Sequence, residues 1–185
     1  MKEEKLSNIV NIVLGKNGSR IQQPKSKIYN VEHMTADLEN LYQLDNNDPS
    51  SNDTNAGNVV FNLNTYQTAV ISVANADKIL DQNFMLLKCN DKVIDPRYLC
   101  FILNNSNSIK RQESAMSQGL IVRRLSTNDI KRMQIPLVRL PQQKLIGQIY
   151  AMQIHYQWLI EQRMNLVNKS LEQIMKSLIE TRKEL

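Results

Sequence analysis

The chain of 185 residues has few of the residue types on which most catalytic and structural sites depend. It contains two cysteines, two histidines, five glycines and five prolines. Two cysteines are too few for a disulfide framework or a four-ligand zinc site, and the two histidines are too far apart to have metal-ligand spacing. With five glycines there is no glycine-rich phosphate loop, and no His-Glu-x-x-His motif is present. The sequence therefore argues against a standalone enzyme.

Long apolar runs are also absent. No stretch of about 18 apolar residues could cross a membrane, and the first 30 residues lack the apolar segment and cleavage site of a secretory signal. We therefore expect a cytoplasmic protein with no membrane partner. The hydrophobic content of 42% is enough to build a buried core. The length suits one domain, or one domain with an appendage, and is too short for two ordinary enzyme domains.

The net charge of +5 is modest, but the charges are clustered along the sequence. Residues 15–27 carry four basic residues and no acidic one, whereas residues 31–54 carry six acidic residues and no basic one. Residues 108–139 carry seven basic and two acidic residues. Basic clusters of this kind attract a polyanion such as nucleic acid. A solvated surface with a patchy charge distribution is the alternative that the charges alone leave open.

Local patterns predict an α+β fold, with a mixed α/β globular domain over residues 1–140 and a long helix over residues 141–185. Four short apolar segments are predicted to be strands, at residues 59–61, 69–73, 84–87 and 120–122. Helices are predicted from Pro96 to about Asn105, over residues 108–118, and after the capping cluster at residues 126–129. Residues 5–14 are expected to form a helical turn or a strand, residues 34–44 a helix or an irregular segment, and residues 15–27 and 45–58 loops.

After Pro141 the pattern is that of one long amphipathic helix. About 43 residues at 1.5 Å each would give a rod roughly 64 Å long. Its apolar residues recur at steps of three and four, with one four-residue interruption of the heptad pattern. A domain of about 140 residues cannot cover such a stripe, so we expect a second copy of the helix to pack on it. A helix lying along its own domain is the alternative. The expected dimer interface is Ile149, Met152, Tyr156, Ile160, Met164, Val167, Leu171, Ile174 and Leu178.

The tetrapeptide Asp95-Pro96-Arg97-Tyr98 partly resembles the Asp-Pro-Pro-Tyr motif with which amino-methyltransferases hold a target base. The second proline is missing, and no glycine-rich cofactor loop precedes it. Aspartate followed by proline is, in contrast, typical of the first turn of a helix. We therefore interpret this tetrapeptide as a helix start rather than a catalytic motif.

Three polar segments carry side chains that can read the edges of DNA bases. Arginine or lysine suits guanine, and asparagine or glutamine suits adenine. No catalytic or metal-binding residue is expected. The candidate DNA-binding residues are Lys16, Asn17, Ser19, Arg20, Gln22 and Lys25 in the first segment, Asn62, Asn64 and Tyr66 in the second, and Gln118, Arg123 and Arg124 in the third.

Several motifs resemble those of the specificity subunit of type I restriction–modification systems. The most specific match is Ile135-Pro136-Leu137 followed by Pro141-Gln142-Gln143-Lys144-Leu145-Ile146, which is a strand with an Ile-Pro exit before a coiled-coil helix. Residues 28–56 match nothing firm, and Asn58 stands where these proteins usually carry aspartate. Further matching motifs are Gly57-Asn58-Val59-Val60-Phe61, Asp95-Pro96-Arg97-Tyr98-Leu99 and Leu125-Ser126-Thr127-Asn128-Asp129.

The resemblance implies a target-recognition domain followed by a long helix, as one half of a specificity subunit that has two such units in tandem. An antiparallel homodimer through residues 142–184 would restore the two-domain shape. The chain would read half of a split site in double-stranded DNA and would bind methyltransferase subunits and, in some systems, a restriction subunit. It would bind no cofactor itself, because S-adenosylmethionine and ATP would be bound by the partner subunits. The alternative is a non-catalytic coiled-coil interaction or regulatory protein with a degenerate recognition domain.

Overall fold

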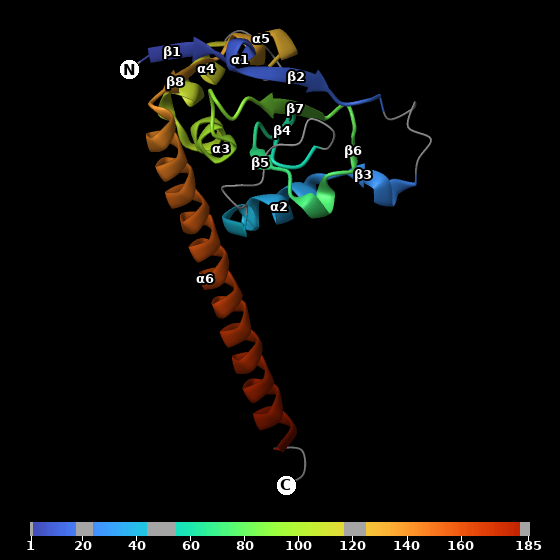
Figure 1. Ribbon diagram of the computed structural model, residues 1–185. Helices are drawn as coiled ribbons and strands as arrows, with labels where there is room; N and C mark the ends of the chain where they lie inside the picture. The colour runs from blue at the N-terminus through green and yellow to red at the C-terminus, as the bar shows by residue number, and fades with distance from the viewer. Residues whose placement is uncertain (1, 18–23, 44–54, 117–124, 182–185) are drawn as a thin grey trace.

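In the computed structural model, the described residues are 2–17, 24–43, 55–116 and 125–181, without the side chains of Lys25, Glu180 and Thr181. They form a mixed α/β domain from which one long helix projects (Figure 1). The predicted fold class is therefore confirmed. The strand expected at residues 120–122 and most of the loop expected at 45–58 lie outside the described residues. The division into a recognition domain and a dimerisation helix stays a prediction.

The elements alternate along the chain without a repeated unit. The strands are β1 (Lys2–Lys5), β2 (Val10–Leu14), β3 (Ile28–Tyr29), β4 (Val59–Asn62), β5 (Thr68–Val70), β6 (Ile79–Leu80), β7 (Phe84–Cys89) and β8 (Gln134–Leu137). The α-helices are α1 (Leu6–Ile9), α2 (Val31–Glu39), α3 (Pro96–Asn105), α4 (Asn107–Met116), α5 (Thr127–Arg132) and α6 (Leu140–Thr181), and the 3-10 helices are η2 (Lys25–Lys27), η3 (Leu41–Gln43) and η4 (Val73–Asn75).

The main sheet has four strands in the order β2-β7-β4-β5, and all of its neighbours are antiparallel. Two smaller pairs flank it: β1 pairs antiparallel with β8, and β3 pairs parallel with β6. The side chains of the main sheet alternate between two cores. Phe61 and Met85 face the core that contains α3 and the start of α6, whereas Val60 and Leu86 face a smaller core that contains α2. The domain is thus a sheet with helices on both faces.

Local capping signals in the sequence predicted two helix starts correctly. The Asp95 side chain accepts a hydrogen bond from the Tyr98 amide at 3.0 Å, with Pro96 at the first helical position. Ser126 and Asp129 form a reciprocal capping box at the start of α5. The helix-start interpretation of Asp95-Pro96 is therefore confirmed.

The strand predicted over residues 69–73 was wrong at its end. Strand β5 stops at Val70, and Val73 already begins the 3-10 helix η4. The Ile71 amide donates to Asn58 O, and Ile71 O accepts from the Gly57 amide, so the chain leaves the sheet by pairing with a turn. β-Branched residues favour a strand, but a local turn ends this one. The two-residue strands β3 and β6 were not predicted.

Helix α6 is bound to the domain by a buried glutamine. Gln143 is 2% exposed, and its Oε1 accepts from the Asp95 amide at 2.9 Å. Its Nε2 donates to Val138 O at 2.9 Å and to Val93 O at 3.2 Å. One side chain thus satisfies three backbone groups and fixes the base of the helix beside α3.

We expect Gln143→Leu to destabilise the protein by about 2–4 kcal/mol, because three buried backbone groups lose their partner. Gln143→Glu should be as harmful at neutral pH, since a carboxylate cannot donate to the two carbonyl oxygens. The loss of stability in Gln143→Glu should become smaller as the pH falls, because a protonated carboxyl group can donate a hydrogen bond. Urea unfolding at pH 7.5 and 5 measures both effects. Gln142→Leu, at an exposed neighbour, is the control, and an equal loss there would contradict this role of Gln143.

A close contact next to this glutamine sets the position of α6 further along the helix. A Cβ atom at Gly147 would lie 2.7 Å from Arg97 Cβ and 2.8 Å from Asp95 Oδ1. Only glycine therefore lets α6 approach the start of α3 this closely. Farther on, the Asn104 amide donates to Tyr150 Oη at 3.0 Å and also to Thr68 O, so that β5, α3 and α6 are joined.

Candidate nucleic-acid interface

Four strand ends meet at one edge of the main sheet. Strands β2 and β4 end there, and β7 and β5 begin there, because all neighbouring strands run antiparallel. The first two polar segments predicted to read DNA leave the sheet at this edge, one after β2 and one in the β4–β5 turn. The register at this edge pairs Leu14 with Met85, Asn62 with Phe84, and Phe61 with Thr68.

Gly15 holds the first segment against the strands beside it. Its amide donates to Phe84 O at 3.0 Å, and the next amide, that of Lys16, donates to Leu80 O at 2.8 Å. A Cβ atom at Gly15 would overlap the carbonyl oxygen of Asp81. The chain can therefore pass this close to Asp81 only as glycine, and it then presents Lys16 and Asn17 with exposed side chains.

The second segment is a turn that is stabilised by hydrogen bonds to the side chain of Asn62. Asn62 is 2% exposed, and its Oδ1 accepts from the amides of Asn64 at 2.8 Å and Thr65 at 3.2 Å. Its side chain therefore forms the turn and does not face solvent. Asn64 is exposed, and its Nδ2 donates to Asn83 Oδ1 at 3.3 Å. The sequence analysis missed Asn83, which lies in the β6–β7 turn at the same edge.

Tyr66 connects this turn to the start of the segment that carries α5. Its hydroxyl oxygen accepts from the Leu125 amide at 2.9 Å, and its backbone has the left-handed φ of 59° that non-glycine residues seldom adopt. Leu125 directly follows the third predicted segment. The edge of the sheet thus brings together one end of each of the three segments, although they are separated by roughly 40 to 60 residues in sequence.

Several candidate residues lie outside the described part of the chain or lack a described side chain. The side chain of Lys25 is not described, although its backbone belongs to η2. The described candidates with exposed side chains are Lys16, Asn17 and Asn64, and Tyr66 is half-buried. No observation here tests DNA contact at any of them, so all stay predictions. The candidates outside the described residues are Ser19, Arg20, Gln22, Gln118, Arg123 and Arg124.

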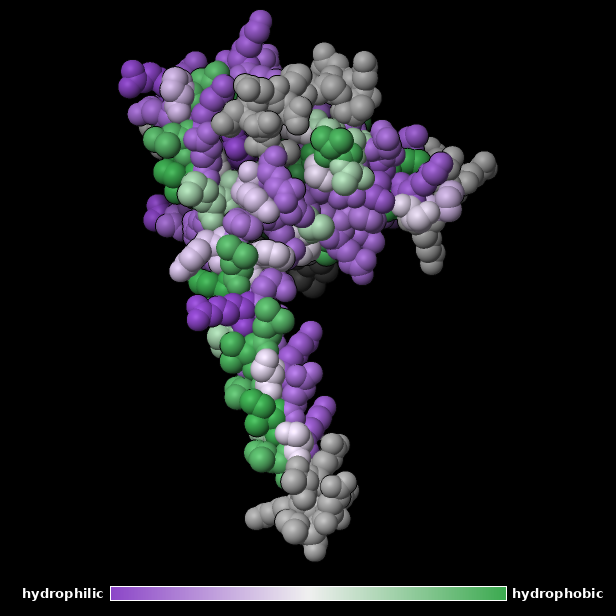
Figure 2. Space-filling model, turned by 60° about the horizontal axis from the view of Figure 1, so that its bottom comes forward, coloured by the Kyte–Doolittle hydropathy of each residue, from purple (hydrophilic) through white to green (hydrophobic). Residues whose placement is uncertain are grey.

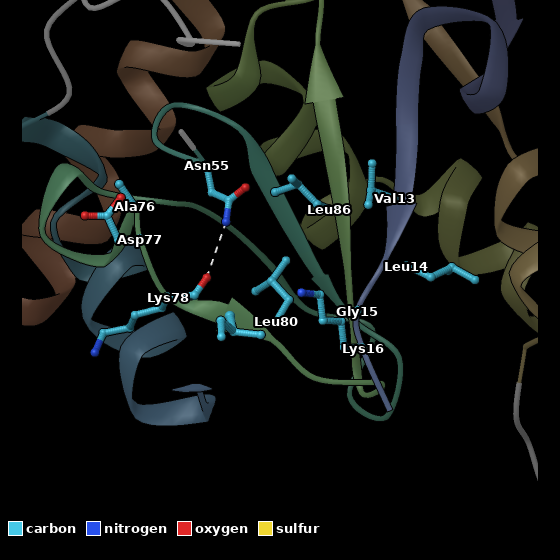
Figure 3. A pocket seen from close by; sticks show the side chains of 11 residues that line it. Val13, Leu14, Gly15, Lys16, Asn55, Ala76, Asp77, Lys78, Leu80 and Leu86 are labelled. Atoms are coloured by element: carbon cyan, nitrogen blue, oxygen red, sulfur yellow. Dashed lines mark hydrogen bonds between the residues drawn. The ribbon is translucent and has the colours of Figure 1, made fainter. Parts of the chain in front are cut away.

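A groove of about 340 Å³ opens beside this edge, between β2 and the segment that enters β6 (Figure 3). Leu80 and Leu86 line it between its two sides, and Val13 lines its β2 side. Lys16, whose amide bonds to Leu80 O, also lines it. Lys78 lies on the other side, where its Nζ donates to Ser26 O at 2.9 Å. The edge therefore combines an apolar recess with two lysines.

The free part of α6 carries the apolar stripe expected from the sequence. Every described side chain from Leu159 to Ile179 is exposed, so this part does not lie along its own domain. Figure 2 shows hydrophobic residues along one side of the rod and hydrophilic residues along the other. All nine residues of the expected interface are exposed, from Val167 at 45% to Met152 at 68%. Dimerisation itself stays a prediction.

The stripe and the domain lie on opposite faces of α6. The residues that face the domain are Gln143, Gly147, Tyr150 and Ala151, all buried, followed by His155, which stacks on Tyr42 with ring centroids 3.6 Å apart. The apolar stripe passes along the other face of the same turns, where its residues remain exposed. The domain therefore leaves the stripe free to meet another helix.

Catalytic features are scarce in the described residues. They contain no group of three or more metal-ligating side chains, and none of their helices is long and apolar enough to span a membrane. Burial raises the pKa of the Cys100 thiol to about 12, and it also raises the pKa of Cys89. Neither thiol is therefore a thiolate nucleophile at neutral pH.

Neither a family model nor a curated protein matches the chain. Similar solved structures do exist. Over 96% of its length the chain matches 48% of a chain in a structure titled for the complex assembly and conformational transition of the type I R-M system, with a TM-score of 0.60 and 16% identity.

Two further structures are less similar. The HsdS subunit from Thermoanaerobacter tengcongensis has a TM-score of 0.49 and 19% identity, over 88% of this chain and 39% of that one. The type I restriction-modification system S subunit from M. genitalium has a TM-score of 0.49 and 11% identity, over 79% and 37%. The chain thus spans about half or less of each of these chains. Its fold is that of part of a protein from a type I restriction–modification system, as its motifs had suggested.

Proposed function

We propose that the chain is a DNA-recognition subunit of a type I restriction–modification complex, and that it performs no chemistry itself. Its sheet edge would read one half of a split site, and two copies would join through antiparallel α6 helices. The observation that carries the proposal is the geometry of α6, whose nine-residue stripe is exposed and faces away from the domain. A two-fold dimer of this kind predicts a palindromic split site.

The geometry of the sheet edge supports a reading role for this part of the domain. The first two polar segments leave the sheet there, and Leu125, which follows the third, bonds to Tyr66 at the same edge, so side chains of the three segments could enter one DNA groove. The edge is fixed by backbone hydrogen bonds at Gly15 and Lys16, and rigid support favours specific readout. The partners in this proposal are double-stranded DNA, a methyltransferase subunit that uses S-adenosylmethionine and, in some systems, a restriction subunit. Such a complex would work in the cytoplasm.

Selection from a library of random split sites tests the proposal directly. The full chain is mixed with its methyltransferase partner, and the bound duplexes are sequenced over several rounds. We expect enrichment of one palindromic pair of half-sites at a fixed spacing. Absence of any enriched sequence, with the partner present and the protein folded, would refute sequence recognition.

The degenerate-domain alternative predicts a different response to mutation. The variant Arg20→Ala, Arg123→Ala, Arg124→Ala removes three sequence-predicted cations from the DNA-reading segments. If these segments bind DNA, affinity falls and the dependence on salt becomes shallower. If the recognition domain has degenerated, both quantities stay unchanged, and the chain serves only as a coiled-coil interaction protein.

A further inference from the structure

Helices α4 and α5 both carry basic residues, and both reach the start of β8 in the β1–β8 pair. The Gln134 amide donates to Gln112 Oε1 at 2.8 Å, and Gln112 Nε2 donates back to Gln134 O at 3.0 Å. This reciprocal pair fixes α4 against the first residue of β8, just after the end of α5. Lys5 lies directly across from Gln134 in β1. We refer to the basic residues of these elements as the basic cluster, which consists of Lys5, Lys110, Arg111, Lys131 and Arg132.

The positive charge of the basic cluster is not cancelled by salt bridges. A salt bridge joins Lys2 to Glu4, outside the cluster. The two acidic residues of α4 and α5 offset part of the positive charge, because Asp129 interacts electrostatically with Arg132 and Glu113 with Lys110. Asp129 accepts from Ser126 Oγ at 2.6 Å in its capping box, and Glu113 is half-buried, which raises the pKa of its carboxyl group. Five basic residues against these two carboxylates leave this part of the surface with a net positive charge.

The charge is divided between the two faces of the main sheet. Helix α2, which carries Glu32 and Glu39 and no lysine or arginine, packs in the smaller core on one face. Helix α5 and the first residues of α4 pack in the larger core on the other face. Figure 1 shows α2 on one side of the sheet and α4 and α5 on the opposite side. A polyanion is thus attracted more to the α4–α5 side than to α2 itself.

The chemistry of the basic cluster suits phosphate groups better than base edges. The glutamines at its centre, Gln112 and Gln134, use their amide groups within the domain, where Gln134 Nε2 also donates to Arg132 O at 3.4 Å. They are not available to read bases. The lysines and arginines that remain can neutralise phosphates, and a phosphate contact selects no sequence.

The basic cluster also lies within reach of the sheet edge. Leu125 bonds to Tyr66 at that edge, and α5 starts two residues later. A six-residue helix is about 9 Å long. One short stretch of duplex can therefore touch both places.

We propose that the basic cluster is a second DNA contact, which binds the sugar–phosphate backbone and turns the α4–α5 side of the domain toward the duplex, with α2 facing away. This inference rests on the proposed function, since it presumes that the chain binds DNA. The basic cluster would thus add a sequence-independent phosphate contact to the sequence-specific contacts made at the sheet edge.

The test compares Lys110→Gln, Arg111→Gln, Arg132→Gln with a matched control, Lys92→Gln, Lys169→Gln, Lys176→Gln. All six positions are exposed, so both variants should fold. Binding of the full chain is measured by fluorescence anisotropy between 50 and 200 mM salt, on a selected split site and on a random duplex; these salt limits are roughly the range over which phosphate contacts dominate. For the cluster variant we expect at least a tenfold loss on both duplexes and a slope reduced by about 2.7 per protomer.

Three outcomes would overturn the inference. If the cluster variant has the same DNA affinity and salt dependence as the control variant, the basic cluster makes no phosphate contact. A loss confined to the selected site would make these residues base readers instead. If the wild-type chain binds neither duplex at 50 mM salt, about the low end of that range, the proposed function fails and this inference fails with it. The first two results leave the proposed function intact.

Discussion

Replacing Ile160 and Val167 by aspartate should convert the proposed dimer into a monomer. Both side chains lie in the exposed stripe of α6, and in an antiparallel dimer each change occurs twice in one interface. A carboxylate buried among apolar side chains without a partner costs several kcal/mol. We therefore expect dimer affinity to fall by roughly a thousandfold or more, since each 1.4 kcal/mol is about a factor of ten. Sedimentation velocity across a concentration series measures this change.

The matched control places the same charges on the other side of the rod. Gln162→Asp and Asn165→Asp also add two carboxylates to exposed turns of α6, but on the side away from the stripe. This control should remain a dimer. A wild-type chain that sediments as a monomer at tens of micromolar, about the concentration at which a stable interface is saturated, would remove the basis for the antiparallel dimer. So would a stripe variant that still dimerises.

Gly15→Ala should damage the sheet edge and DNA binding together. The added methyl group would overlap Asp81 O, which is backbone and cannot move aside as a side chain does. Overpacking of this kind costs about 1–3 kcal/mol or more. We expect a loss of stability in that range in urea unfolding, and at least a tenfold loss of DNA affinity because the Lys16 segment is displaced. Dimerisation should not change, because α6 is far from this edge (Figure 1).

Asn11→Ala provides the comparison on the same strand. Asn11 is an exposed residue of β2, away from the contact with Asp81. It should change stability by less than about 0.5 kcal/mol, as exposed substitutions usually do. If Gly15→Ala unfolds no more easily than Asn11→Ala, then Gly15 is not the residue that holds the segment in place.

The features that could be predicted from the sequence are those that depend on residues close together along the chain. The caps at Asp95 and Ser126 and the long amphipathic helix are signals within a few residues of one another, and the structure has them where they were expected. Short pairings between distant segments leave no such signal. Strands β3 and β6 are two residues each and pair across about 50 positions, so no periodicity identifies them.

Asn62 shows how the same residue type can support two interpretations. An asparagine in a polar segment suggested a reader of adenine, whereas the structure places its side chain inside the β4–β5 turn. The local sequence Asn62-Leu63-Asn64-Thr65 between two apolar strands is also typical of a turn closed by an asparagine side chain. The meeting of distant segments at the sheet edge depends on strand order, which the sequence alone does not reveal.

The opposite placement of the domain and the apolar stripe on α6 has a consequence for signalling within an antiparallel pair. Each globular domain would lie on the outer side of its own α6 helix, so the two domains would not touch. DNA binding by one domain could then affect the other domain only through bending or twisting of the paired α6 helices. Insertions that make the paired α6 helices more flexible should therefore remove the coupling between the two domains, even though every DNA contact is kept.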